Sequence, residues 1–274
     1  MQSKIQNVLA PAYEPVAMLW AEDKPEKALQ FKKGRFSCVM FGFANAARGR
    51  AAVFDRETYG CWGGGVGLGF GNTYTEFPGG EQGFHYFLSC GNAEWVTGQQ
   101  IGNGMHHAGV DRHFVDEFLQ GERYRKGPGE VADFVDALPI QDIPATYVVM
   151  KPLSQVTQGE VPKVVTFLAN AEQLSALVVL ANYGRQSIDA VRIPFAAGCQ
   201  SVGLLPLEEE NQTHPRAVVG LTDISARAHV RKLLGRDLLT FSMPWSLYQE
   251  MEANVEGSFF DRPTWQGLTG TQTD

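Results

Sequence analysis

The chain has 274 residues, of which 44% are hydrophobic and 19% are charged, and its formal net charge is −7. This ordinary globular composition excludes an intrinsically disordered chain. The negative charge, without any basic stripe to offset it, argues against non-specific binding to nucleic acid or to anionic membranes.

The first twenty residues lack the pattern of a secretory signal peptide, because Pro11, Glu14 and Pro15 interrupt any apolar run. The longest apolar stretch, at 174–181, is too short to cross a bilayer. We therefore expect a cytoplasmic protein with neither a nucleic-acid nor a membrane partner. In that compartment thiols stay reduced, so cysteines more often bind metal, react or pack than form disulfides.

The first half of the chain predicts alternating strands and helices. Ser37 is a good N-cap, which places Cys38 in the first turn of a helix. The predicted elements are, in order, a strand at 16–20, a helix opened by residues 23–25, a helix at 37–49, a strand at 51–54, a glycine-rich turn region at 60–71 and a strand at 84–88.

A helical section and then a second α/β stretch follow. Asn170 with Gln173 three residues later forms a capping-box pattern, and Gly184 suits the end of that helix. The predicted elements are helices at 112–119 and 130–138, strands at 147–150 and 164–168, a helix at 170–184, a cysteine turn at 198–201, a strand at 217–221, a helix at 224–234, a strand at 238–242 and a helix opened by Pro244.

The two stretches suggest an internal duplication. The segment around Cys38 aligns with that around Cys199, and similar alignments join 15–19 to 162–167, 53–56 to 219–222 and 86–91 to 239–244. The expected fold class is α/β or α+β, with two pseudo-repeated lobes that each hold a mixed sheet and packed helices. The lobes would be 1–150, with a helical insert at about 105–140, and 151–274, unless the chain forms one compact domain.

The four cysteines are the strongest candidates for functional residues in this sequence. Cys38 and Cys199 stand at predicted helix starts, where backbone amides lower the pKa of a thiol, and Cys61 lies among glycines that let a bulky inorganic group approach the backbone. Iron–sulfur clusters take up to four cysteines from distant loops. The close C-x-x-C pair of ferredoxins and zinc ribbons is absent, and burial as a small hydrophobe stays open for each cysteine.

Other motifs are weaker. The glycine run at 60–71 has no G-x-G-x-x-G register, so a structural turn is favoured there over a nucleotide site. His106, His107 and His113 lack the spacing of a helical metal site. Asp223 can cap a helix and Arg227 could reach an anion, with capping the simpler interpretation.

Several short motifs together resemble one uncharacterised family, known as domain of unknown function 169, which is found largely in archaea and anaerobic bacteria. The resemblance covers nearly the whole chain. The motifs are Ser37-Cys38-Val-Met, Cys61-x-Gly63-Gly64 with Leu68-Gly-Phe70, Gly121-Glu-Arg-Tyr124, Lys151-Pro-Leu153, Gln173-Leu-Ser-Ala-Leu177, Gly198-Cys-Gln-Ser201, Leu221-Thr-Asp-Ile-Ser-Ala-Arg227 and Phe241-Ser-Met-Pro244. The family carries no reaction to transfer, but Cys38, Cys61 and Cys199 fall inside its motifs and Cys90 does not. Its anaerobic distribution suits an oxygen-sensitive cluster.

Three hypotheses follow. The first is a metal-binding protein, with an iron–sulfur cluster held between the lobes by Cys38, Cys61 and Cys199, Cys90 as an optional fourth ligand, and a redox or accessory role. The second is a non-enzymatic protein that binds a small ligand in an inter-lobe cleft; the cleft would be lined by Gly63, Gly64, Asp223 and Arg227. The third is a thiol enzyme with one cysteine of low pKa. The substrate, the redox partner and a homo-oligomeric state are left open.

Overall fold

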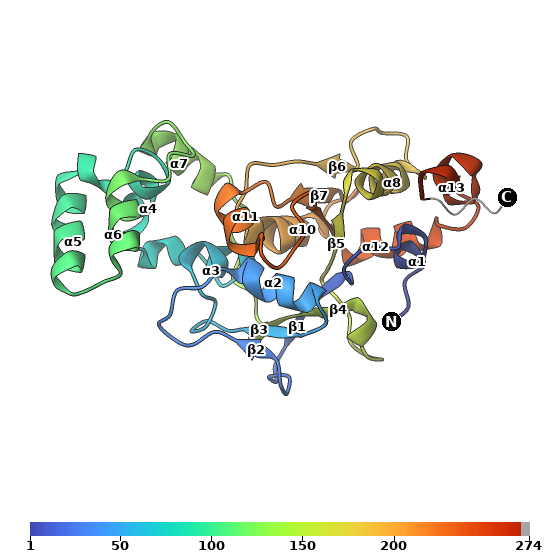
Figure 1. Ribbon diagram of the computed structural model, residues 1–274, viewed down its shortest axis with the longest axis horizontal. Coiled ribbons are helices and arrows are strands. Elements are labelled where there is room, and N and C mark those ends of the chain that lie inside the picture. Colours follow the sequence, from blue (N-terminus) through green and yellow to red (C-terminus); the bar gives the residue numbers. More distant parts are fainter. Residues whose placement is uncertain (270–274) are drawn as a thin grey trace. The chain divides into compact units, whose positions relative to one another are not determined.

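A computed structural model describes residues 1–269, and these form two compact units (Figure 1). The first unit combines 1–70 with 142 onward, and the second is 71–141. The division into lobes at residue 150 stays a prediction. Strands from before and after that residue belong to the same sheet. Within the described residues, no helix is both long enough and apolar enough to span a membrane.

The first unit is built on a mixed sheet, which confirms the α/β class. Among the described residues the sheet has eight strands in the order β2-β3-β4-β1-β5-β8-β7-β6. Their bounds are β1 Val16–Ala21, β2 Leu29–Gln30, β3 Ala52–Phe54, β4 Tyr147–Pro152, β5 Val164–Ala169, β6 Val191–Arg192, β7 Ala217–Gly220 and β8 Leu239–Pro244. The strands predicted near 16, 51, 147, 164, 217 and 238 are therefore confirmed.

The pairing of the strands is regular across this sheet. At each edge the outer two strands are parallel, β2 with β3 and β6 with β7. All other neighbours are antiparallel, including the central pair of β1 with β5. The strands from both halves of the chain thus join a single sheet through β1 and β5.

Helices cover both faces of the sheet because side chains alternate along its strands. Met18 and Met150 belong to one buried cluster with α2 and α11, whereas Leu19 and Phe167 belong to another with α1, α8 and α12. The helices of this unit are α1 Lys4–Leu9, α2 Val39–Ala47, α3 Trp62–Leu68, α8 Ala171–Asn182, α9 Gly198–Val202, α10 Leu204–Glu209, α11 Ile224–Val230, α12 Trp245–Ala253 and α13 Pro263–Thr269. The capping box predicted for α8 is present at Asn170 and Gln173.

The second unit consists of helices around an aromatic cluster. Tyr74 stacks on Phe84 with ring centroids 3.8 Å apart, and Phe77 contacts Phe118 at 6.0 Å. The helices are α4 Gly80–Leu88, α5 Val96–His107, α6 Arg112–Gln120 and α7 Pro128–Asp136. The helices predicted at 112–119 and 130–138 are confirmed.

Three local predictions are wrong. Residues 84–88 are the end of helix α4 and not a strand, so the proposed alignment of 86–91 with 239–244 also fails. No helix follows Asp23, where the chain instead reaches the short edge strand β2. The glycine run is not an open turn, because Trp62–Leu68 forms α3; packing of its glycines against neighbours outweighs their low helix propensity.

Candidate functional site

Three of the four cysteines stand at the starts of helices in the first unit. Cys38 is the N-cap of α2 and Cys61 is the N-cap of α3, both with extended backbone. The Cys61 sulfur accepts a hydrogen bond from the Gly64 amide at 3.3 Å. Cys199 is the second residue of α9 and is 6% exposed. For Cys61 the position follows from N-cap geometry, in which a side-chain acceptor meets an unpaired amide of the first turn.

Backbone contacts hold the Cys38 and Cys61 segments side by side. The Ser37 amide donates to the Gly60 carbonyl at 3.2 Å. Gly60 has a φ of 88°, and a Cβ there would lie only 2.4 Å from the Ser37 oxygen. Glycine is therefore required at the residue just before Cys61.

The Cys199 segment packs directly on α3. The Cys199 thiol donates to the Gly63 carbonyl at 3.1 Å. A Cβ on Gly67 would lie 2.8 Å from the Cys199 sulfur, and one on Gly203 would lie 2.2 Å from the Gly67 oxygen. Helix α3 is glycine-rich because α9 lies against its backbone.

Asp223 joins the same neighbourhood from α11. Its side chain caps that helix by accepting from the Ala226 amide at 3.2 Å. Its other oxygen accepts from the Gly198 amide at 3.0 Å, at the residue before Cys199. Leu221, two residues earlier, is buried with a φ of 60°, a left-handed conformation that is unusual for a bulky residue.

Burial and neighbouring charges raise the pKa of two of these thiols. Burial raises the pKa of Cys38 to about 12, with further increases from the charges of Cys61 and Asp223. Burial also raises the pKa of Cys199 well above its usual value, and Cys61, Cys38 and Asp223 add to that effect. The expectation that helix starts would lower these two pKa values is wrong, because desolvation of the thiolate outweighs the nearby amides.

The side chains are turned toward backbone partners. Within residues 1–269, no three histidine, cysteine, aspartate or glutamate side chains already stand as a group that could hold a metal ion. Cys199 is bonded to Gly63 and Cys61 to Gly64, as described above. A metal would have to replace the thiol protons and draw the sulfurs away from these partners.

The remaining predicted residues fall in different places. Cys90 is half-buried just after α4 in the second unit. The Arg227 guanidinium donates to the carbonyls of Arg236 and Leu238 at 2.9 and 2.8 Å, so it supports the loop before β8. His107 ends α5 and His113 lies on α6, where it pairs with a glutamate.

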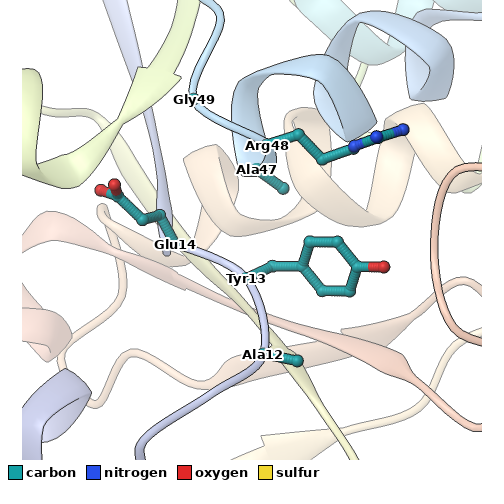
Figure 2. A pocket seen from close by; sticks show the side chains of 6 residues that line it. All are labelled: Ala12, Tyr13, Glu14, Ala47, Arg48 and Gly49. Atoms are coloured by element: carbon teal, nitrogen blue, oxygen red, sulfur yellow. The ribbon is translucent and has the colours of Figure 1, made fainter.

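Two surface hollows lie elsewhere in the first unit. One has a volume of about 370 Å³, and Figure 2 shows Tyr13, Glu14 and Arg48 around it. The other, of about 340 Å³, lies beside Arg56 and Tyr147. Neither is lined by a cysteine or by the residues predicted for the small-ligand cleft.

Sequence reasoning missed the glycines that bring the segments together. Gly198 is one of these, since a Cβ there would lie 2.8 Å from the Met40 side chain and 3.0 Å from Ala226. Gly67 and Gly203 act in the same way between α3 and α9. The signal in the sequence is the density of glycine beside cysteine, which marks close packing of backbone and not the turn predicted at 60–71.

The sequence profile of a family described as uncharacterised ArCR, domain of unknown function 169, matches residues 4–254. The chain belongs to this family. The match covers all three clustered cysteines and Asp223, and it confirms the resemblance argued from the short motifs. No curated protein and no solved structure matches the chain.

Proposed function

We propose that this member of the family holds a metal centre, an iron–sulfur cluster, through Cys38, Cys61 and Cys199, and that it has a redox or accessory role. The observation that carries the proposal is the convergence of three thiols from distant parts of the chain on one buried region. The Ser37 amide bonds to the Gly60 carbonyl and the Cys199 thiol bonds to the Gly63 carbonyl, so the segments of Cys38 and Cys199 both meet the segment that carries Cys61. Thiolates are the ligands that iron–sulfur clusters and zinc prefer.

The acidity of the thiols favours this proposal over a thiol enzyme. A nucleophilic cysteine needs a low pKa to be a thiolate near neutral pH. Cys38 and Cys199 have the opposite property, because both are buried and their pKa values are raised. A bound metal ion reverses that preference, since its charge deprotonates a coordinating thiol outright.

We also propose that the first unit consists of two pseudo-repeated halves. The support comes from the sheet, whose order from centre to edge is β1-β4-β3-β2 on one side and β5-β8-β7-β6 on the other. In each half the fourth strand pairs with the first, the third with the fourth and the second with the third. The thiol cluster then lies where the two halves meet, as Cys38 comes from one half and Cys199 from the other.

The test is anaerobic purification of the full chain, followed by a visible spectrum and by analysis of iron, sulfide and zinc. We expect a brown protein with matched iron and sulfide, whose colour and iron are lost in Cys38→Ser and in Cys199→Ser. Thermal unfolding of each variant checks that it is folded. Stoichiometric metal retained in both folded variants would contradict the proposal, and zinc in place of iron would correct the identity of the centre.

Cys90→Ser is the matched control, because Cys90 belongs to the other unit and lies outside the family motifs. Unchanged iron in this variant would leave three thiols as the cysteine ligands. Loss of iron would make Cys90 the fourth ligand that the sequence left open.

A further inference from the structure

Two segments of the first unit carry basic charge with no acidic residue to balance it. Residues 31–50 and 224–236 hold nine of the chain's 23 lysines and arginines and none of its 30 aspartates and glutamates. The remaining residues are therefore strongly acidic, and they account for the net charge of −7. Because the two segments lie far apart in the sequence, no single stretch of it reveals this concentration of positive charge.

The fold brings the two segments together on one surface. Helix α11 packs on α2, as Figure 1 shows. The Phe36 ring lies 6.4 Å from the His229 ring, and the Tyr13 hydroxyl donates to the Leu233 carbonyl at 3.2 Å. In Figure 2 the side chains of Tyr13 and Arg48, which line the same hollow, extend in the same direction. The surface, here called the basic face, carries Lys32, Lys33, Arg35, Arg48, Arg50, Arg231, Lys232 and Arg236.

The charges of the basic face are accessible to a partner. All eight of its lysines and arginines are exposed. Among the residues that the structure describes, Lys33 alone of these eight forms a salt bridge, with Glu57 at 2.6 Å. Exposed charges of one sign attract a surface of the opposite sign, and salt screens that attraction.

Apolar side chains are exposed beside these charges. Phe36 is 62% exposed, Phe41 on α2 is 39% exposed and Ile224 is 66% exposed. Phe36 lies two residues before Cys38, and Ile224 is the first residue of α11, so both lie next to the thiol cluster. Protein–protein interfaces combine apolar and aromatic anchors of this kind with a polar rim.

We infer that the basic face docks an acidic protein of the electron-carrier class, with Phe36 and Ile224 as apolar anchors. This inference rests on the proposed redox role of the thiol centre. Charge complementarity selects an acidic partner, since like charges across an interface are costly. A small acidic carrier covers this face alone, whereas a long nucleic acid would also extend over acidic surface that repels it. The carrier is then held beside the segment that carries Cys38.

The experiment titrates a purified acidic bacterial ferredoxin into the full chain by isothermal calorimetry. The wild type should bind at low salt, with a Kd that rises at least roughly tenfold between about 50 and 300 mM salt. Lys232→Glu should raise the low-salt Kd at least about fivefold, because it sets a negative charge against an acidic partner. Phe36→Ala should raise Kd by a similar factor and keep the salt dependence, because it removes an apolar anchor and no charge.

Arg262→Glu is the matched control for Lys232→Glu. It makes the same change in net charge at an exposed residue just before α13, a helix that packs in the other buried cluster of the first unit. Its Kd should equal that of the wild type. Thermal unfolding of each variant checks that it is folded.

The outcomes separate this inference from the proposal beneath it. A wild-type protein that does not bind the ferredoxin at low salt overturns the docking face, also where a single-stranded oligonucleotide or a second copy of the chain binds instead. Equal weakening in Lys232→Glu and Arg262→Glu overturns it as well, because net charge then explains the effect. Iron and zinc analysis of the same wild-type preparation tests the metal centre separately. A metal-free protein whose binding still depends on Lys232 and Phe36 contradicts the metal centre and supports the docking face.

Discussion

Gly67 lies against Cys199 so closely that a Cβ on the glycine would come within 2.8 Å of the cysteine sulfur. The same hypothetical atom would lie 2.7 Å from the Cys199 carbonyl carbon, so rotation of the thiol alone would not relieve the clash. Helix α3 can therefore carry Cys61 to the neighbourhood of Cys199 only if glycine occupies this turn. This contact links the glycine-rich run to the chemistry of the thiols.

Gly67→Ala should lower the free energy of unfolding by about 1–3 kcal/mol, as expected for overpacking in a close-packed contact. It should also reduce metal content, because α9 must shift to make room. The measurement is urea unfolding of the purified protein. Gly104→Ala is the control, since nothing lies within 4 Å of a Cβ there, and it should be neutral or more stable by up to about 1 kcal/mol. Equal stability of the two variants would show that α3 and α9 are not in this contact.

The buried thiols predict a loss of stability in the metal-free protein at alkaline pH. The pKa of Cys38 is about 12 in the folded chain against an ordinary value of 9.0, and that of Cys199 is also raised. The folded state thus keeps protons that the unfolded state has lost, so stability is full below about pH 9 and falls as the pH rises toward 12.

For each such thiol the slope is about 1.4 kcal/mol per pH unit within that window. Urea unfolding between pH 8 and 10.5 should show the decline in the wild type and a shallower one in the double variant Cys38→Ser, Cys199→Ser. Parallel curves for the two proteins would mean that these thiols are not buried in the folded state.

Glu209 forms a buried carboxylate link between the edge of the sheet and α10. Its side chain is 1% exposed and lies 3.0 Å from Arg216 and 3.1 Å from Arg192. Glu209→Gln should cost about 2 kcal/mol in urea unfolding, because it removes charge-assisted bonds from a buried site. Glu57→Gln is the control, since Glu57 pairs with Lys33 and both are exposed, and it should change stability by less than about 0.5 kcal/mol. A loss of unfolding free energy no larger than that of the control would show that Glu209 does not stabilise the edge of the sheet.

Asn92 should stabilise the second unit locally. Its side-chain amide is buried and donates to the carbonyls of Gly83 and Phe118 at 3.0 and 3.1 Å. Asn92→Ala removes both hydrogen bonds, which should lower the stability of this unit by about 1–3 kcal/mol. Hydrogen exchange should become faster in α4 and α6 while β1 and β5 keep their protection. The exposed Asn103→Ala serves as the control and should change neither set. Faster exchange throughout the chain would show that the two units open together.

Sequence patterns predicted most of the sheet because its strands are buried runs bounded by turn residues. The capping box at Asn170 shows that a local signal also located the start of a helix correctly. The wrong predictions lie where contacts between residues distant in the sequence determine the local secondary structure. Phe84 and Leu88 are apolar and strand-like, yet their segment is helical because Phe84 stacks on Tyr74 within a helical unit. Single-sequence periodicity does not separate these alternatives in so short a run.

The candidate site was predictable in its thiols, whereas the contacts that bring Asp223 beside them were not. Cysteines beside glycine and serine stand out in the sequence, whereas Asp223 resembles an ordinary helix cap, and it is one. Its place near the thiols depends on tertiary contacts such as its bond to the Gly198 amide, which no spacing along the chain encodes.

The most direct test of the central claim is the iron and acid-labile sulfide content of the full chain after strictly anaerobic purification, measured beside Cys38→Ser and Cys199→Ser. The account predicts matched iron and sulfide with absorbance near 400 nm in the wild type, and loss of both in the two folded variants. A colourless wild-type protein without iron or zinc, prepared without exposure to oxygen, would contradict it. The three cysteines would then be part of the core around α2, α3 and α9.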